Sequence, residues 1–140
     1  MIVTELTVGD VPRACELLAA AFQSVAAKDK VEIHQERSRQ GWRTFVIKKE
    51  SLVVGTISLL VERKYTRDGA CVGHIEDLAV RENERNNGVG SALVNHCLDL
   101  CHKERCYKVI LNCLPELREF YQRLGFKCFE SQMRYSILAT

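Results

Sequence analysis

The stretch "RENERNNGVGS" at residues 81–91 constrains the fold most, because it joins an apolar run to an amphipathic one. The run before it, "CVGHIEDLAV" at 71–80, predicts a strand. Two glycines at the start of a helix permit positive φ and let a ligand approach unpaired N–H groups. We therefore predict a strand, an anion-binding loop and a helix, although the loop alone leaves a simple flexible turn open. Helical spacing after the loop places seven residues on one stripe: Val89, Ala92, Leu93, His96, Cys97, Leu100 and Cys101.

The composition indicates one globular domain over residues 1–140 and excludes several function classes. A net charge of +2 is too small to indicate nucleic acid or a membrane surface as a partner. The start, "MIVTELTVGD", lacks the features of a signal peptide, and no run reaches the roughly 18 apolar residues of a membrane span. Seven cysteines without a Cys-x-x-Cys pair predict small buried side chains in a reducing compartment and no metal site. These features predict a cytoplasmic protein.

The remaining segments predict an α/β (α+β) fold, with a mixed, mostly antiparallel twisted sheet flanked by helices. Residues 43–50 and 51–64 are rich in β-branched side chains and predict a hairpin. The apolar run 107–113 predicts a central strand with one crossover before it. The other expected elements are a strand at 2–7, helices at 11–25 and 29–40, a short helix between Pro115 and Gly125, and a last strand at 126–137.

Two adjacent carboxylates, Glu76 and Asp77, interrupt the apolar strand at 71–80. Neighbours in a strand face opposite sides, so at least one should face packed protein. A buried carboxylate is costly without a partner. The pair therefore indicates either a functional site for a cationic group or a structural ion pair.

Two motifs in order resemble the GNAT superfamily of acetyl-CoA-dependent N-acetyltransferases. "RNNGVG" after an apolar strand resembles its motif A, and "YKVILNCLPELREFYQRLGF" resembles its motif B. Together with "GHIEDLAV", these segments are most similar to the glucosamine-6-phosphate N-acetyltransferase family, densely from about residue 55 to residue 135. The resemblance implies a GNAT-type fold and an acetyl-CoA co-substrate.

The resemblance also implies how acetyl-CoA is bound. The CoA pyrophosphate would lie on the loop, and the pantetheine arm would pair with the preceding strand. Tyr121 would lie beside the CoA sulfur, although its helical spacing alone favours a core tyrosine. Leu117 departs from the family, in which many members have an asparagine that contacts CoA. The cofactor-binding residues so implied are Leu78, Ala79, Val80, Arg85, Asn86, Asn87, Gly88, Val89, Gly90, Ser91, Asn112 and Tyr121.

On the acceptor side, the resemblance implies that Glu76 and Asp77 line the sugar site and that catalysis involves Tyr121, Glu76 and Asp77. Asn112 stands where the family more often has an acid, which weakens any charged role there. A homodimer is implied, with the partner subunit completing the site. The substrate-binding residues would be Lys64, Arg67, Glu76, Asp77, Tyr107 and Lys108.

The function so implied is direct transfer of acetyl from acetyl-CoA to the amine of D-glucosamine 6-phosphate, through a ternary complex. The product, N-acetylglucosamine 6-phosphate, would serve UDP-N-acetylglucosamine biosynthesis. Two alternatives stay open: an acetyltransferase for another amine, such as a protein N-terminus or a polyamine, and a non-catalytic acyl-CoA-binding module. The identity of the general base also stays open, since proton loss can be direct or through water.

Overall fold

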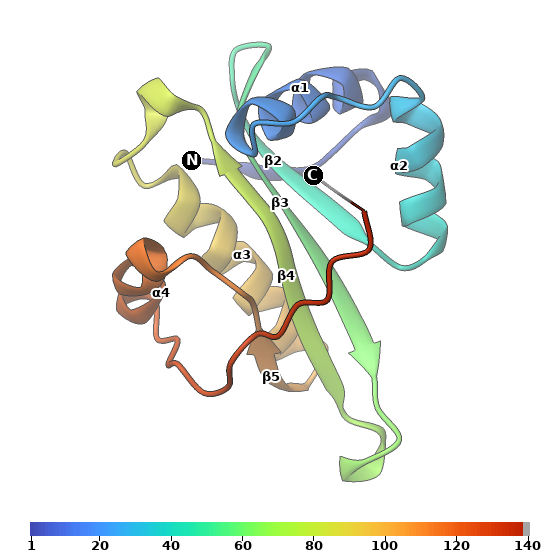
Figure 1. Ribbon diagram of the computed structural model, residues 1–140, viewed down its shortest axis with the longest axis vertical. Coiled ribbons are helices and arrows are strands. Elements are labelled where there is room, and N and C mark those ends of the chain that lie inside the picture. The colour runs from blue at the N-terminus through green and yellow to red at the C-terminus, as the bar shows by residue number, and fades with distance from the viewer. Residues whose placement is uncertain (139–140) are drawn as a thin grey trace.

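The computed structural model describes residues 1–138, which form one sheet with helices on both sides (Figure 1). Short 3₁₀ turns lie at Val8–Asp10, Arg67–Gly69, Glu82–Glu84 and Pro115–Leu117. The strands are β1 (Val3–Glu5), β2 (Arg43–Lys49), β3 (Leu52–Arg63), β4 (Cys71–Val80) and β5 (Cys106–Ile110). The helices are α1 (Val11–Ala21), α2 (Lys30–Arg39), α3 (Val89–Lys103) and α4 (Arg118–Arg123).

The sheet is mixed and mostly antiparallel, as the sequence predicts. Its strand order is β1-β2-β3-β4-β5, and only the β4–β5 pair is parallel. A parallel pair needs a crossover connection, and the loop with α3 provides it. This connection places the glycine-rich loop at the end of β4.

Helices cover the two faces of the sheet with separate apolar clusters. On one face α3 packs through Leu93 and Cys97 against Phe45, Ile57 and Ile75. On the other face α1 packs against the sheet through Leu17, which joins Val46, Val53 and Ala79. Alternate strand residues point to opposite faces, so strands β2 and β3 supply both clusters. In Figure 1, α1 and α2 lie on one side of the sheet, with α3 on the other.

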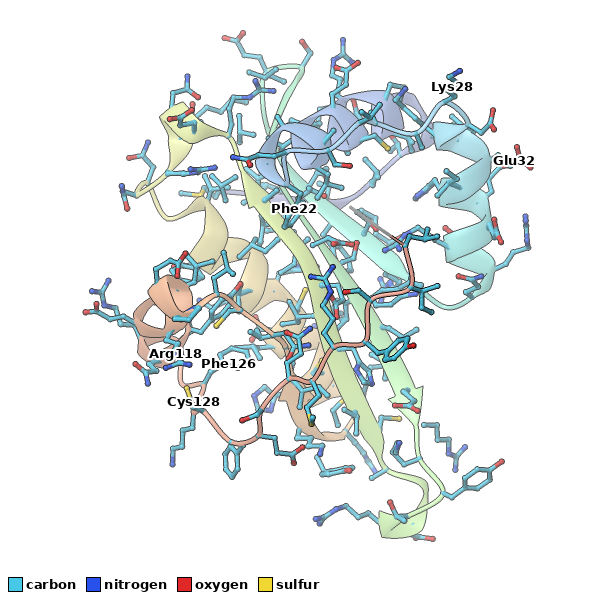
Figure 2. The ribbon with its side chains drawn as sticks, viewed as in Figure 1. Phe22, Lys28, Glu32, Arg118, Phe126 and Cys128 are labelled. Atoms are coloured by element: carbon cyan, nitrogen blue, oxygen red, sulfur yellow. The ribbon has the colours of Figure 1, made fainter. Side chains whose placement is uncertain are left out.

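Two sequence predictions about the C-terminal half are wrong. No strand forms at 126–137; this segment is irregular, and its side chains from Lys127 to Leu138 are exposed. Figure 2 shows Phe126 and Cys128 just below α4, where the segment leaves the helix. Within residues 1–138 the β5 edge therefore has no further strand partner, so the run at 107–113 is an edge strand and not a central one. Its regular part also ends at Ile110.

The N-terminal helix and the cysteines also differ in part from expectation. Helix α1 ends at Ala21 and not at residue 25 as predicted, so Phe22 and Val25 lie beyond the helix and are exposed. Cys97 and Cys101 are buried as predicted, and burial raises the pKa of each thiol to about 12. By contrast, Cys113 and Cys128 are exposed free thiols. Among residues 1–138, no helix is long and apolar enough to cross a membrane.

Gly73 lets α3 approach β4 closely, and this contact makes a stability prediction. A Cβ atom at Gly73 would lie 2.5 Å from the sulfur of Cys101. Gly73→Ala should lower the free energy of unfolding by about 2 kcal/mol through overpacking. Adding Cys101→Ala removes the clash, so the double variant should lose less than the sum of the two single variants. Urea unfolding of all four proteins measures this coupling, and strict additivity would contradict the predicted contact.

Candidate active site

The carboxylates Glu76 and Asp77 lie on a bulge in β4, and both are exposed. The register with β3 shifts between Thr56 and Ser58, and Asp77 has a φ of 56°. A bulge lets neighbouring residues escape the alternation of a regular strand. The expectation that at least one carboxylate faces packed protein is therefore wrong. Instead, both carboxylates are exposed to solvent.

Strand β4 also has an open backbone edge beyond His74. Its pairing with β5 ends at the His74–Ile110 pair, whereas its pairing with β3 continues to Val80. Leu78, Ala79 and Val80 thus lack a strand neighbour on the β5 side among residues 1–138. Unpaired N–H and C=O groups of this kind can bind an extended ligand as an added strand.

The loop after β4 exposes the start of helix α3. Gly88 is the residue before the helix and has a φ of 83°, in the left-handed region. The bond from the Ala92 N–H to the Gly88 carbonyl, 3.0 Å, is the first of the helical series. The N–H groups before Ala92 therefore have no partner four residues back, which is the backbone arrangement that can bind an anion. Arg85 adds a positive charge and donates from Nε to the Val80 carbonyl at 3.3 Å.

Gly90 has a different role from Gly88. A Cβ atom at Gly90 would lie 3.2 Å from the Phe120 ring, so the glycine permits close packing of α4 on the loop. Conformational freedom is needed instead at Asn86, which has a φ of 66°. Asparagine is one of the side chains that tolerate this region. The second left-handed residue of the loop is thus an asparagine and not the second glycine.

An ion pair ties the loop to the β2–β3 hairpin. Lys49 Nζ lies 2.7 Å from Glu84 Oε2, and the hydrogen bond from Lys49 lowers the pKa of the Glu84 carboxyl. The stabilising contribution of a carboxyl with a lowered pKa is present at neutral pH and is lost as pH falls through that pKa. Glu84 is therefore charged at neutral pH and fixes one side of the loop.

A small cavity of about 70 Å³ lies beside Glu76. His74, Glu76 and Asn112 supply its polar groups, and Ile110 and Leu111 supply its apolar walls. The cavity forms where β5 diverges from β4, so Asn112 comes to lie near Glu76 although it is 36 positions later in the sequence. Its size suits an amino group or a few waters and not a whole sugar.

Tyr121 in α4 is 7% exposed and belongs to the α3-side core. Its ring packs edge-on against Phe120 at 4.9 Å and Phe126 at 5.7 Å. Burial raises the pKa of Tyr121 to about 12, so the phenol stays protonated at neutral pH. Among residues 1–138, no group hydrogen-bonds to its hydroxyl. The hydroxyl oxygen is not fully buried, so it keeps some contact with solvent. A packed ring with a free O–H can donate to a ligand.

The cations predicted to bind substrate form two groups. Arg67 and Lys108 both lie against the Tyr107 ring, at 4.4 and 5.5 Å from its centroid. Lys64 is separate from them and instead lies 3.4 Å from Glu62 Oε2. The structure therefore brings three of the six predicted substrate-binding residues together in one cluster at the β3–β4 hairpin and the start of β5: Arg67, Tyr107 and Lys108.

Sequence reasoning missed two contacts of the site. Arg37 of α2 lies 3.9 Å from Asp77 Oδ2 and stacks on Trp42 at 4.9 Å. His74 Nε2 lies 2.9 Å from Glu62 Oε1 across two strands. Neither pair is close in sequence, and each depends on the register of β3 and β4 or on the position of α2. The one signal available was a histidine within an otherwise apolar strand.

Together, the loop and the open β4 edge have the geometry to bind an extended ligand with an anionic end, next to two exposed carboxylates. The model of the acetyltransferase (GNAT) family matches residues 11–126. Because this match covers most of the chain, the protein belongs to the GNAT family of acetyltransferases.

Curated proteins with similar sequences include two acetyltransferases. Glucosamine 6-phosphate N-acetyltransferase of Trypanosoma brucei brucei is 41% identical over 85 residues, which cover 61% of this chain and 58% of the relative. A probable glucosamine 6-phosphate N-acetyltransferase 2 of Oryza sativa subsp. japonica is 44% identical over 77 residues, covering 55% and 46%. The chain thus aligns with about half the length of these curated relatives.

Solved structures are similar over nearly the whole chain. A Trypanosoma brucei acetyltransferase has a TM-score of 0.91 at 33% identity and covers 97% of this chain and 99% of its own. Glucosamine-6-phosphate N-acetyltransferase from Arabidopsis thaliana has a TM-score of 0.85 at 28% identity, covering 96% and 97%. The GNAT-type fold predicted from the sequence is confirmed.

Proposed function

We propose that this protein transfers acetyl from acetyl-CoA to the amine of D-glucosamine 6-phosphate. The observation that carries the proposal is the continuity of β4, which runs from two exposed carboxylates, along an open backbone edge, to an anion-binding loop. A thioester bound along that edge would place its reacting carbon near Glu76 and Asp77. The names of the similar enzymes support the choice of amino sugar.

The loop and strand fit acetyl-CoA as a substrate. Its pyrophosphate would bind the N–H groups of residues 86–91, with Arg85 adding charge. Its pantetheine amides would pair with the backbone of Leu78 to Val80. Leu78 and Val80 are partly buried against the α3-side core, so their backbone is held rigidly. Rigid placement supports reaction, because it fixes the thioester before the amine arrives.

In this mechanism the carboxylates bind the ammonium group of the sugar and orient it toward the thioester. After proton loss, the amine nitrogen attacks the thioester carbon, and a backbone N–H near Leu78 stabilises the oxyanion. Collapse of the tetrahedral intermediate breaks the C–S bond and releases the CoA thiolate. The Tyr121 hydroxyl would donate its proton to that sulfur, which its raised pKa allows at neutral pH.

We favour direct transfer over an acyl-cysteine intermediate. The pKa values of Cys97 and Cys101 are about 12, so the nucleophilic thiolate form is scarce at neutral pH. The exposed thiols of Cys113 and Cys128 are free, which supports the proposal of a reducing, cytoplasmic setting.

The cluster of Arg67, Tyr107 and Lys108 is our candidate for the sugar phosphate site. Two cations on one ring concentrate positive charge where the chain as a whole has little, at +2. A guanidinium suits bidentate binding of phosphate. Lys64 has a carboxylate neighbour in Glu62 and would contribute less.

A homodimer would complete this site. The segment after α4 exposes large apolar side chains, with Phe129, Met133 and Tyr135 each about nine-tenths exposed. The β5 edge lies open among the described residues. Exposed apolar side chains and an open strand edge together indicate an interaction surface. A second copy of this chain would cover both.

One assay tests the proposed function. Release of free CoA thiol from acetyl-CoA is measured with glucosamine 6-phosphate, with glucosamine and with a peptide amine as acceptors. We expect the phosphosugar to give the highest kcat/KM, and the unphosphorylated sugar to lose at least about tenfold through the missing ion pairs. Equal rates with all three acceptors, or none with the phosphosugar, would reject the proposal.

A further inference from the structure

His74 and Glu62 form a hydrogen-bonded pair on the sheet face that carries Glu76. The His74 Nε2 atom lies 2.9 Å from Glu62 Oε1, and the imidazole lines the same small cavity as Glu76 and Asn112. The hydrogen bond from His74 lowers the pKa of Glu62, so this partner is a carboxylate at neutral pH. An imidazole fixed by a carboxylate on one nitrogen is the arrangement of a general base.

The hydrogen bond determines what the other nitrogen can do. A carboxylate only accepts hydrogen bonds, so Nε2 carries the hydrogen and donates it to Glu62. Nδ1 of the neutral ring then holds a lone pair and can accept a proton. We propose that His74 accepts the proton from the acceptor ammonium and that Glu62 is its positioning residue. This inference rests on the proposed function, because it assigns the general base of that reaction.

The other polar groups of the cavity are less suited to this role. Asn112 is an amide and cannot accept a proton at neutral pH. Asp77 lies toward Arg37 of α2. Glu76 can bind the ammonium as its counter-charge, because a carboxylate accepts charge-assisted hydrogen bonds from an ammonium group. The imidazole of His74 is the remaining polar group of the cavity, and its position is fixed by Glu62.

The charged groups around His74 come from three strands. Glu62 on β3 contacts the ring directly, and Lys64, just after β3, lies beyond Glu62 at 3.4 Å. Glu76 shares the cavity from β4. On β5 the neighbouring residue is Ile110, and Lys108 lies two positions earlier on the same face. The segment 127–138, which carries Lys127, Glu130 and Arg134, is exposed, and no hydrogen bond or salt bridge joins these described residues to His74.

The step balances with groups already named. The N–H bond of the ammonium breaks, its proton moves to His74 Nδ1, and the freed electron pair forms the C–N bond. Glu62 stabilises the resulting imidazolium through Nε2–H. As the C–S bond breaks, the nitrogen of the tetrahedral intermediate loses a second proton to solvent, and Tyr121 donates its proton to the departing thiolate. His74 then releases its proton to solvent and Tyr121 takes one up, so one proton is released for each acetyl group transferred. No oxidant, metal or further reactant is required.

The test is the pH dependence of kcat in His74→Gln, with both substrates saturating, from about pH 5.5 to pH 9. Wild-type kcat should fall on the acid side as the base becomes protonated. In His74→Gln we expect kcat to be about 100-fold lower and the acid limb to be absent, with the KM for the sugar changed less than threefold. A loss below threefold, or an unchanged acid limb, would overturn the inference.

Matched variants separate this role from a structural one. His102 is exposed on α3, so His102→Gln should leave both kcat and the acid limb unchanged. Glu62→Gln keeps an acceptor for Nε2–H and should retain the acid limb with a loss of up to about tenfold, whereas Glu62→Ala should lose more. Equal losses of kcat in Glu62→Gln and Glu62→Ala would argue against a positioning role for Glu62. Failure of the proposed function is a distinct result: the wild-type protein would then not acetylate the phosphosugar at all.

Discussion

Tyr121→Phe is expected to lower kcat about 10³-fold while the Kd for CoA changes less than threefold. The substitution removes one hydroxyl, which no group among residues 1–138 hydrogen-bonds, and keeps the ring that packs against Phe120 and Phe126. The loss should therefore fall on thiolate departure and not on folding. Steady-state kinetics and calorimetric titration with CoA measure the two quantities separately.

The matched control is Tyr65→Phe, because this tyrosine is fully exposed and has no proposed role. It should leave kcat and the Kd for CoA unchanged. The melting temperature of Tyr121→Phe should stay within a few degrees of wild type. Equal losses of turnover and CoA affinity in Tyr121→Phe would instead indicate a tyrosine that acts only in the core.

Local sequence patterns predicted most of the fold. The wrong predictions concern segments whose structure depends on contacts with residues distant in sequence. The loop between β4 and α3 was recognisable because the period of apolar residues changes from strand to helix across it. The edge position of β5 was not recognisable, because an apolar run resembles a central strand whether or not a further strand pairs with it. Residues 126–137 alternate like a strand, yet within residues 1–138 they pair with none.

In the candidate site, too, local features were predicted and features that depend on distant contacts were not. Glycines and an arginine indicated the anion loop directly, because their backbone and charge properties are local. The exposure of Glu76 and Asp77 was mispredicted, since a bulge depends on how β3 and β4 register and not on either strand alone. The same register brings His74 to Glu62. Identifying that pair required knowing which residues of β3 and β4 lie side by side.

The bulge also explains how one strand can serve two ligands. Up to His74, β4 pairs on both sides, and His74 and Glu76 lie on the face away from α3. Beyond His74, β4 has only β3 as a partner among residues 1–138, which leaves an edge that an extended chain could pair with. In the proposed reaction, the amine and the thioester would therefore approach the same point from different directions. A ternary complex needs this separation, because both substrates must be bound at once.

The second large effect is expected at Gly88. In Gly88→Val a β-branched side chain must occupy the left-handed region at a φ of 83°, which is strained by about 1–2 kcal/mol or more. The loop should rearrange, and two or three charge-assisted N–H bonds to the pyrophosphate would be lost. At about 1.5 kcal/mol each, kcat/KM for acetyl-CoA should fall on the order of 10³-fold.

Gly88→Asn is the matched control, because asparagine tolerates the left-handed region and can also precede a helix. Its kcat/KM for acetyl-CoA should stay within about tenfold of the wild-type value and should be far higher than that of Gly88→Val. Thermal unfolding should show both variants folded, since Gly88 is exposed and the core residues Val89 and Leu93 are unchanged. A folded Gly88→Val protein with normal kcat/KM for acetyl-CoA would show that the pyrophosphate does not bind on this loop.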